Sequence, residues 1–303
     1  MKTTSKIQAA AAGFALLLAL TGCGGTTSTS PTDPKTADIS VGVQPDEKAV
    51  SLLPASYKDK GELTVAMYLH YPPTTFLAED NSTPIGLNPD IARLVAKKLG
   101  LKLKFENTVF DTIIPGIDGG RYDFTVTTMA PTPERLKVLD MIDYFKAGNS
   151  VAVSAGNPLK LTNETLCGKN IAVTAGSTGQ LKRLPALSEQ TCTSKGQPAI
   201  NAVTLPNVQE ALTQLASKRI DGILYDTTSL AWAEKQQPKS FTILTPQINV
   251  GSSDLTAIGV KKGSALTPAL QAAIQSVLNS PEYKKSLSTW GLDAGAITDA
   301  KLN

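Results

Sequence analysis

The chain has 303 residues, of which 41% are hydrophobic and 18% charged, a balance typical of a folded protein with one large or two modest domains. Its net charge is +3, with Lys and Arg spread along the sequence, so no basic patch predicts a nucleic-acid partner. One histidine and three cysteines, without a CxxC pair, are too few soft ligands for a zinc or iron–sulfur site. We therefore expect neither a metal nor a cofactor.

The first 22 residues have the features of an export signal. Lys2 and Lys6 are followed by an unbroken apolar run over residues 9–20, which has the length of a signal-peptide core rather than of a membrane span. The run ends in LTGC, which resembles the bacterial lipobox. We expect residues 1–22 to be a lipoprotein signal peptide and Cys23 to carry a diacylglycerol and a palmitate, a durable anchor. The alternative is an ordinary signal peptide with a chance cysteine.

The stretch after Cys23 is rich in Gly, Thr, Ser, Pro and Asp and has almost no apolar periodicity. Such a segment cannot bury enough surface to fold. We therefore expect residues 23–50 to form the lipidated cysteine and a flexible tether.

Cys167 and Cys192 remain once Cys23 is assigned to lipid. Outside the cytoplasm, two leftover cysteines in one region favour a disulfide. Two buried free thiols are the alternative. A catalytic cysteine is disfavoured, since no histidine lies near either residue in the sequence.

The next part of the chain alternates strands with helices. Periodicity predicts strands at 62–67, 101–105 and 122–127 and helices at 88–100 and 110–117, the first helix capped by Asn88. Strands that alternate with helices imply a mostly parallel sheet covered on both faces, with ligands beyond the carboxyl ends of the strands.

A similar succession begins at Asn170. It comprises strands at 171–174, near 203 and at 220–224, and helices at 179–187 and 208–216. Two stretches, 146–154 and 248–258, would connect the two halves, and helices at 268–278 and 282–289 would return the chain to the first half. The sequence thus predicts two α/β lobes.

The segment TPER at 132–135 has the features of a helix start, with Thr132 as cap and Pro133 at the first position. A cation in a first turn is disfavoured by the helix dipole, so Arg135 needs another role. Unpaired N–H groups beside an arginine fork would bind a carboxylate. A surface ion pair is the alternative for Arg135.

Two further segments supply complementary groups. The strand at 171–174 leads into AGSTG, a second anion-facing terminus unless Ser177 or Thr178 is an ordinary helix cap. Asp226 follows the strand at 220–224, where its carboxylate could bind an ammonium group.

Six ordered blocks resemble the amino-acid-binding proteins of ABC importers, the polar-amino-acid branch (family 3) of extracellular solute-binding proteins. They are GELTVAMYLHYPP, GLNPDIARLVAKKLGLKLKFE, FDTIIPGIDGGRYD, MAPTPERLKVLD, LCGKNIAVTAGSTGQLK and ASKRIDGILYD. The resemblance implies a two-lobed α/β fold of the type II periplasmic-binding-protein kind, with mixed, mostly parallel sheets, helices on both faces and two hinge strands. Lobe 1 would hold residues 51–148 and 253–303, and lobe 2 residues 149–252.

The resemblance also implies the roles of seven residues. Arg135 would bind the α-carboxylate of an amino acid with N–H groups near Ala130 and Thr178, and Asp226 would bind the α-ammonium with help from Thr128. Tyr71 and Phe110 match aromatic positions that contact the ligand's side chain, with core packing as the alternative for both.

The implied function is a lipid-anchored, extracytoplasmic, monomeric protein that captures a free amino acid and delivers it to an ABC transporter permease, without catalysis. One alternative is a dehydratase on the same fold, with Asp226 or Glu134 as general acid. Another is a receptor that presents its ligand to a membrane sensor.

Overall fold

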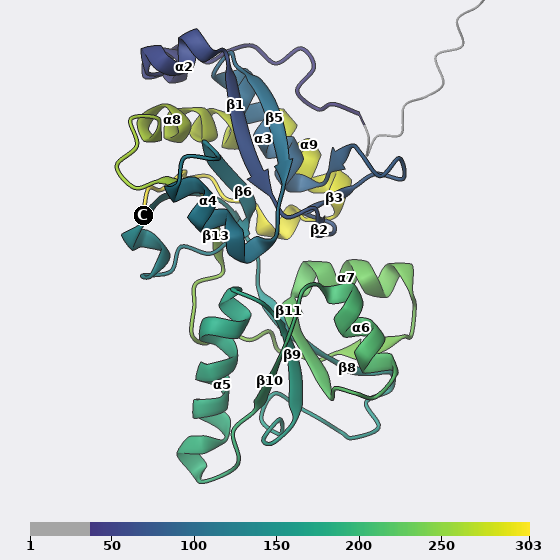
Figure 1. Cartoon of the computed structure of the whole chain (residues 1–303). Helices are drawn as coiled ribbons and strands as arrows, with labels where there is room; N and C mark the ends of the chain where they lie inside the picture. The colour runs from purple at the N-terminus through teal and green to yellow at the C-terminus, as the bar shows by residue number, and fades with distance from the viewer. Residues whose placement is uncertain (1–36) are drawn as a thin grey trace, which may run out of the picture. The chain divides into compact units, whose positions relative to one another are not determined.

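The computed structural model describes residues 37–303 (Figure 1). The predicted signal peptide, the lipidation site Cys23 and the start of the tether lie outside the described residues. The tether prediction is wrong at its end, because α1 (Glu47–Ser51) is helical, capped by the Asp46 side chain, and buries Ala49 in the core. No helix among residues 37–303 is long and apolar enough to span a membrane.

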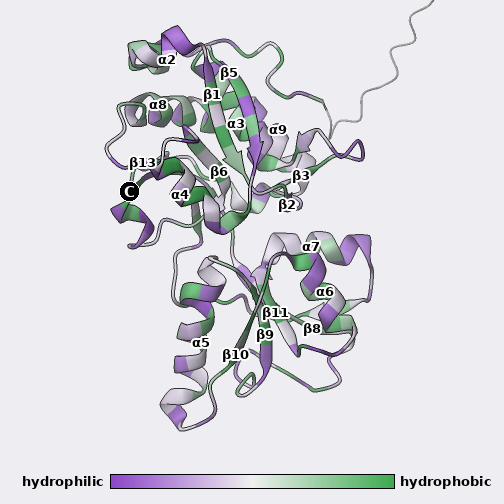
Figure 2. Ribbon diagram, viewed as in Figure 1, coloured by the Kyte–Doolittle hydropathy of each residue, from purple (hydrophilic) through white to green (hydrophobic). Residues whose placement is uncertain are grey.

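The first sheet has the strand order β5-β1-β6-β13-β7. Strand β1 pairs parallel with β5 and β6, whereas β13 is antiparallel to both β6 and β7. The strands of this sheet are β1 (Glu62–Met67), β5 (Lys102–Asn107), β6 (Phe124–Met129), β7 (Leu139–Lys146) and β13 (Leu255–Lys261). Strand β5 lies at the edge, and parts of it are hydrophilic (purple in Figure 2). It carries exposed Lys102 and Lys104, charges that protect a free edge from pairing with another chain.

Both faces of this sheet are buried. Leu63, Val65 and Met67 face one hydrophobic cluster, while Ala66 and Tyr68 face another. This alternation follows from the two-residue period of a strand. The helices of this half are α1, α2 (Ala55–Lys60), α3 (Leu87–Lys98), α4 (Ile113–Asp118), α8 (Thr267–Leu278) and α9 (Pro281–Trp290). A small sheet of β2 (His70–Tyr71), β3 (Thr75–Leu77) and β4 (Pro84–Ile85) precedes α3.

The second sheet has the strand order β10-β9-β11-β8-β12. Its strands are β8 (Asn149–Ser154), β9 (Asn170–Thr174), β10 (Asn201–Leu205), β11 (Gly222–Asp226) and β12 (Phe241–Ile243). Helix α5 (Leu184–Thr191), which continues a π-helical turn at Gly179–Arg183, packs on one face, and α6 (Val208–Ala216) and α7 (Thr227–Gln236) pack on the other (Figure 1). We refer to the first sheet with its helices as lobe 1 and to the second as lobe 2.

The chain crosses between the lobes twice. The first crossing joins the end of β7 at Lys146 to the start of β8 at Asn149, and the second runs from β12 to β13. Sheets of mixed direction with helices on both faces agree with the predicted fold class.

Two predicted helix starts are wrong. Asn88 does not cap α3, because the helix begins at Leu87 and its cap is Gly86, whose φ of 118° and close approach to Thr74 leave no room for a side chain. The TPER segment opens no α-helix either. It leads only into a three-residue 3-10 turn at Arg135–Lys137.

Other differences are smaller. The helix predicted at 110–117 is a 3-10 turn at Phe110–Thr112 followed by α4. Strand β7 and helix α7 were not predicted, and the stretch expected to connect the lobes at 248–258 includes the start of β13.

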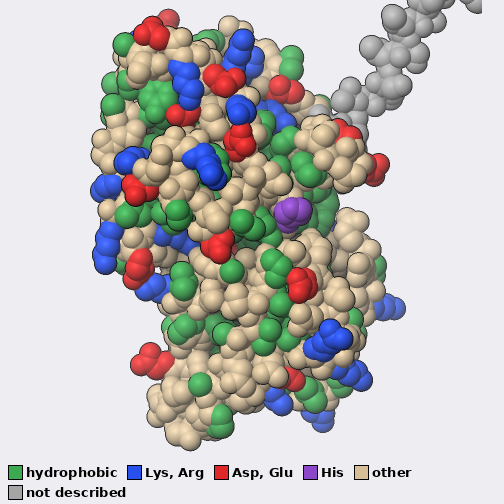
Figure 3. Space-filling view, in the orientation of Figure 1, with side chains coloured by type: hydrophobic (Ala, Val, Ile, Leu, Met, Phe, Trp, Pro, Cys, Tyr) green, Lys and Arg blue, Asp and Glu red, His purple; other side chains and the backbone are tan. Residues whose placement is uncertain are grey.

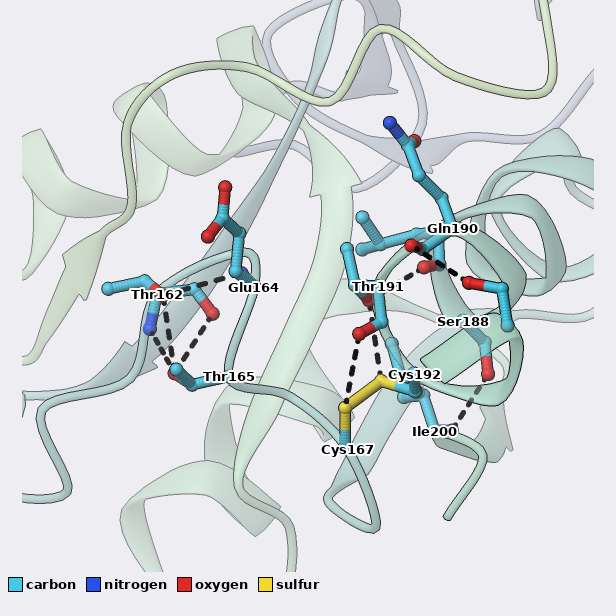
Figure 4. The surroundings of a disulfide bond; sticks show 11 residues. Thr162, Glu164, Thr165, Cys167, Ser188, Gln190, Thr191, Cys192 and Ile200 are labelled. Carbon is cyan, nitrogen blue, oxygen red and sulfur yellow. Dashed lines mark hydrogen bonds between the residues drawn. A yellow bond between two sulfur atoms is a disulfide. The ribbon is translucent and has the colours of Figure 1, made fainter. Parts of the chain in front are cut away.

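Cys167 and Cys192 form a disulfide between the loop before β9 and the end of α5, with their Cα atoms 5.5 Å apart (Figure 4). Cys192 is fully buried in the lobe 2 core.

We predict that reducing this disulfide lowers the free energy of unfolding by about 3 kcal/mol, because it closes a loop with a sequence separation of 25 residues. Urea unfolding with and without a reductant, and of a Cys167→Ser/Cys192→Ser variant, measures the change. An unchanged midpoint in both comparisons would contradict the prediction.

Candidate ligand-binding site

One cavity brings together six of the seven predicted ligand residues from both lobes. Tyr71, Phe110, Thr128 and Arg135 come from lobe 1, and Thr178 and Asp226 from lobe 2. The seventh, Ala130, does not line the cavity but contributes its carbonyl to the Arg135 side chain. The other lining residues are Tyr68, Thr127, Asn149, Thr174, Ser177, Gly179, Leu224 and Tyr225.

Arg135 is a buried cation, 6% exposed. Its Nη1 donates to the Ala130 carbonyl at 2.9 Å and its Nη2 to the Gly176 carbonyl at 3.0 Å. It forms no salt bridge with any described residue. Burial lowers the pKa of the guanidinium to about 10, which leaves it charged at neutral pH. A guanidinium has five N–H donors, so three remain for an anion.

Asp226 ends β11 and is 9% exposed. Its carboxylate accepts from Asn149 Nδ2 at 2.7 Å and from the Tyr71 hydroxyl, both neutral donors. Burial raises the pKa of Asp226 to about 6, against the opposing effect of these two hydrogen bonds. A carboxylate accepts about four hydrogen bonds, so this one can still bind a cationic donor.

Tyr71 and Phe110 are partly buried and pack against a core cluster of lobe 1 while lining the cavity. The Tyr71 ring lies 4.9 Å from that of Tyr225, and the guanidinium of Arg135 lies 5.6 Å from the Phe110 ring. Both residues therefore pack against the core and also line the cavity.

Thr128 is held in an uncommon conformation, with a φ of 53°. Its N–H donates to the Tyr144 hydroxyl at 3.0 Å, Tyr144 donates to Asn88 Oδ1 at 2.6 Å, and Asn88 Nδ2 donates back to Thr128 Oγ1 at 2.9 Å. This closed ring of hydrogen bonds fixes Thr128 at the cavity and gives the buried Asn88 its role.

Ser177 and Thr178 have different roles in the turn that follows β9. Ser177 Oγ accepts from the N–H of Gln180 at 3.1 Å, which is ordinary capping, whereas Thr178 makes no side-chain cap bond. Thr178 therefore keeps its hydroxyl for the cavity.

The two lobes meet around this cavity through several hydrogen bonds. Tyr68 donates to the Pro206 carbonyl at 2.5 Å, and Lys182 forms an ion pair with Glu134 at 2.6 Å. The Arg135–Gly176 and Tyr71–Asp226 hydrogen bonds also join the lobes.

Asn149 and Tyr225 line the cavity but were not predicted as site residues. Each lies in a buried strand, and the sequence pattern of a buried strand indicates core packing and not ligand binding.

The face of the molecule in Figure 3 carries Lys and Arg interspersed with Asp and Glu. No group of three or more His, Cys, Asp or Glu among residues 37–303 is arranged to hold a metal ion.

Two α/β lobes with two crossings and a polar cavity lined from both sides define a protein of the two-lobed solute-binding class. The sequence profile of the bacterial extracellular solute-binding proteins, family 3, matches residues 63–293. The chain belongs to this family.

Individual relatives agree with this assignment. The chain is 25% identical to the arginine-binding protein ArgT of Corynebacterium glutamicum over 256 residues, 84% of this chain and 82% of that protein. It is 28% identical to the ABC transporter glutamine-binding protein GlnH of Bacillus subtilis over 68% of this chain and 72% of that protein. A solved structure of an ancestral arginine-binding protein bound to arginine superposes with a TM-score of 0.67 at 30% identity, covering 76% of this chain and 98% of that one. The predicted family and the type II fold are thus confirmed.

Proposed function

We propose that this protein binds one free amino acid as its zwitterion between the two lobes, with Arg135 on the α-carboxylate and Asp226 on the α-ammonium. One observation carries the proposal. A buried cation of lobe 1 and a buried carboxylate of lobe 2 line the same cavity, and neither forms a salt bridge within the described residues.

The energetics of burial favour such a ligand. A buried charge without a partner of opposite sign costs several kcal/mol, and a zwitterion supplies both partners at once. Because the two protein charges belong to different lobes, the ligand makes both contacts only when the lobes are together. Binding therefore favours closure by these differential contacts.

Thr128 and Thr178 have supporting roles in this proposal. The fixed Thr128 would accept from the ammonium, and Thr178, with N–H groups near Ala130, would donate to the carboxylate. Tyr71 and Phe110 would contact the ligand beside these charges.

The cellular setting follows from the family and the sequence. We propose that the mature chain begins at a lipid-modified Cys23, is held outside the cytoplasm by that lipid, and acts as a monomer. It would hand its amino acid to an ABC transporter permease. A receptor for a membrane sensor would use the same cavity, and neighbouring genes for a permease and an ATPase would favour the importer.

We further propose that the protein performs no reaction on its ligand. A pKa of about 6 at Asp226 would also suit a general acid, so the dehydratase alternative has a direct test. Incubation with prephenate or arogenate is expected to give no product, and turnover that Asp226→Asn abolishes would favour the enzyme instead.

The main test is a thermal-shift screen of the purified protein against the twenty amino acids, followed by calorimetry. A ligand at a hundred times its dissociation constant adds about 2.7 kcal/mol of stability, an easily measured shift. Amino acids blocked at the α-amino or the α-carboxyl group serve as controls and are expected to give none. Equal shifts from blocked and free amino acids would contradict recognition of both charged groups.

We predict that binding weakens in acid. Because the pKa of Asp226 is about 6 without ligand and a bound ammonium would lower it, protonation competes with binding below that pH. The affinity is expected to be about tenfold weaker at pH 5 than at pH 7. Calorimetry at both values measures the change, and Asp226→Asn should remove the pH dependence. A wild-type affinity that is flat over this range would contradict the role of Asp226.

A further inference from the structure

The charges that line the cavity are few. Arg135 is the one cation and Asp226 the one carboxylate among the lining residues of the described chain. If the proposed function is correct, both are taken by the two charged groups that every amino acid shares. The ligand's side chain would therefore contact the other residues that line the cavity.

That remaining wall includes Tyr68, Thr174, Leu224 and Tyr225. These side chains are uncharged. Burial raises the pKa of Tyr68 to about 12, so its phenol stays neutral and its proton stays on the bond to the Pro206 carbonyl. A charged side chain of the ligand would find no opposite charge here.

Other acids lie outside the lining of the cavity. Glu134 and Asp111 line a neighbouring pocket, which shares Phe110, Arg135 and Thr178 with the cavity. Glu134 is already paired with Lys182, and Asp111 is exposed to solvent. Neither acid lines the cavity of the ligand.

Tyr225 contributes to the cavity wall a buried hydroxyl that lacks a hydrogen-bond partner among the described residues. Its side chain is 4% exposed, and its hydroxyl makes no direct hydrogen bond, although the Thr174 hydroxyl lies near enough to influence its pKa. A buried hydroxyl without a partner costs free energy that a bonded one does not. A polar atom of the ligand would remove that cost.

We propose that the amino acid bound here has an uncharged side chain that carries a hydrogen-bonding group, and that the Tyr225 hydroxyl selects it. The inference rests on the proposed function and narrows it. It sets this chain apart from its arginine-binding relatives, whose ligand has a cationic side chain.

Calorimetry with glutamine, asparagine, serine, threonine, methionine, glutamate, lysine and arginine tests the inference. We expect the tightest ligand to be one of the first four, and lysine, arginine and glutamate to bind at least about 100-fold more weakly, because a buried unpaired charge is costly. Arginine or lysine as the tightest ligand would overturn the inference and leave the proposed function standing. No binding by any amino acid would overturn both.

The variant Tyr225→Phe isolates the hydroxyl. Because this hydroxyl has no direct partner in the protein, its loss should leave the melting temperature nearly unchanged. The ratio of the affinities for the best polar ligand and for methionine is expected to fall about tenfold relative to wild type. A purely structural role of Tyr225 would leave that ratio unchanged, and an unchanged ratio would overturn the assignment of Tyr225.

Discussion

Replacing Arg135 with alanine is expected to weaken amino-acid binding at least about 100-fold, since the α-carboxylate would then be buried without a cation. The fold should survive. Arg135 forms no salt bridge within residues 37–303. The substitution removes its hydrogen bonds to the Ala130 and Gly176 carbonyls, but it also removes the cost of burying a cation that has no partner of opposite charge. Calorimetry gives the affinity, and a thermal melt gives the stability.

A matched control for Arg135→Ala is Lys137→Ala, which removes an exposed cation two residues away. The control is expected to keep wild-type affinity. Asp226→Asn removes the other charge at nearly constant shape and should weaken binding to a similar extent. Wild-type affinity in either Arg135→Ala or Asp226→Asn would contradict the zwitterion site.

Replacing Arg183 with methionine is expected to lower the free energy of unfolding by about 2–4 kcal/mol. Arg183 is 1% exposed and lies in the π-helical turn before α5. Its guanidinium donates to the Ile248 carbonyl at 2.7 Å, to the Ser253 carbonyl at 3.0 Å and to Asp254 at 2.7 Å. It thus ties lobe 2 to the segment that returns the chain to lobe 1.

The neighbouring Lys182→Met serves as the control for Arg183→Met. Lys182 pairs with Glu134 at 2.6 Å, but both side chains are partly exposed to solvent, so this bridge contributes little to stability. Urea unfolding followed by far-UV circular dichroism compares the two variants. Equal midpoints would show that the Arg183 network does not stabilise the second crossing.

Local patterns predicted several elements closely. The Asn207 side chain accepts from the Glu210 N–H at 2.8 Å, and Val208, Ala211 and Leu215 lie buried along α6, which spans the predicted residues. Helix capping and the 3.6-residue hydrophobic period depend on residues that are close together in the chain, so both can be recognised in the sequence of one protein. Strand β1 matches its prediction because the two-residue alternation of a strand is equally local.

The helix start predicted at 132–135 was wrong because a cap and a proline are compatible with other turns. Thr132 Oγ1 does accept from the Arg135 N–H at 3.4 Å, but the chain then enters β7 instead of continuing as a helix. The pairing of β7 with β13, more than a hundred residues further on, decides that outcome. Long-range pairing overrides local preference here.

The sequence by itself determined the family, much of the alternation of strands and helices and the two charges proposed to bind the ligand, because ordered motifs and local periodicity carry that information. The tertiary structure alone decided that Asn149 bonds to Asp226, that Asn88 fixes Thr128 and that the Tyr225 hydroxyl is buried without a direct partner. These contacts join segments 40 to 77 residues apart or depend on which face of a buried strand a side chain occupies. No local pattern encodes that placement, because it is set by how the strands register and how the two lobes meet.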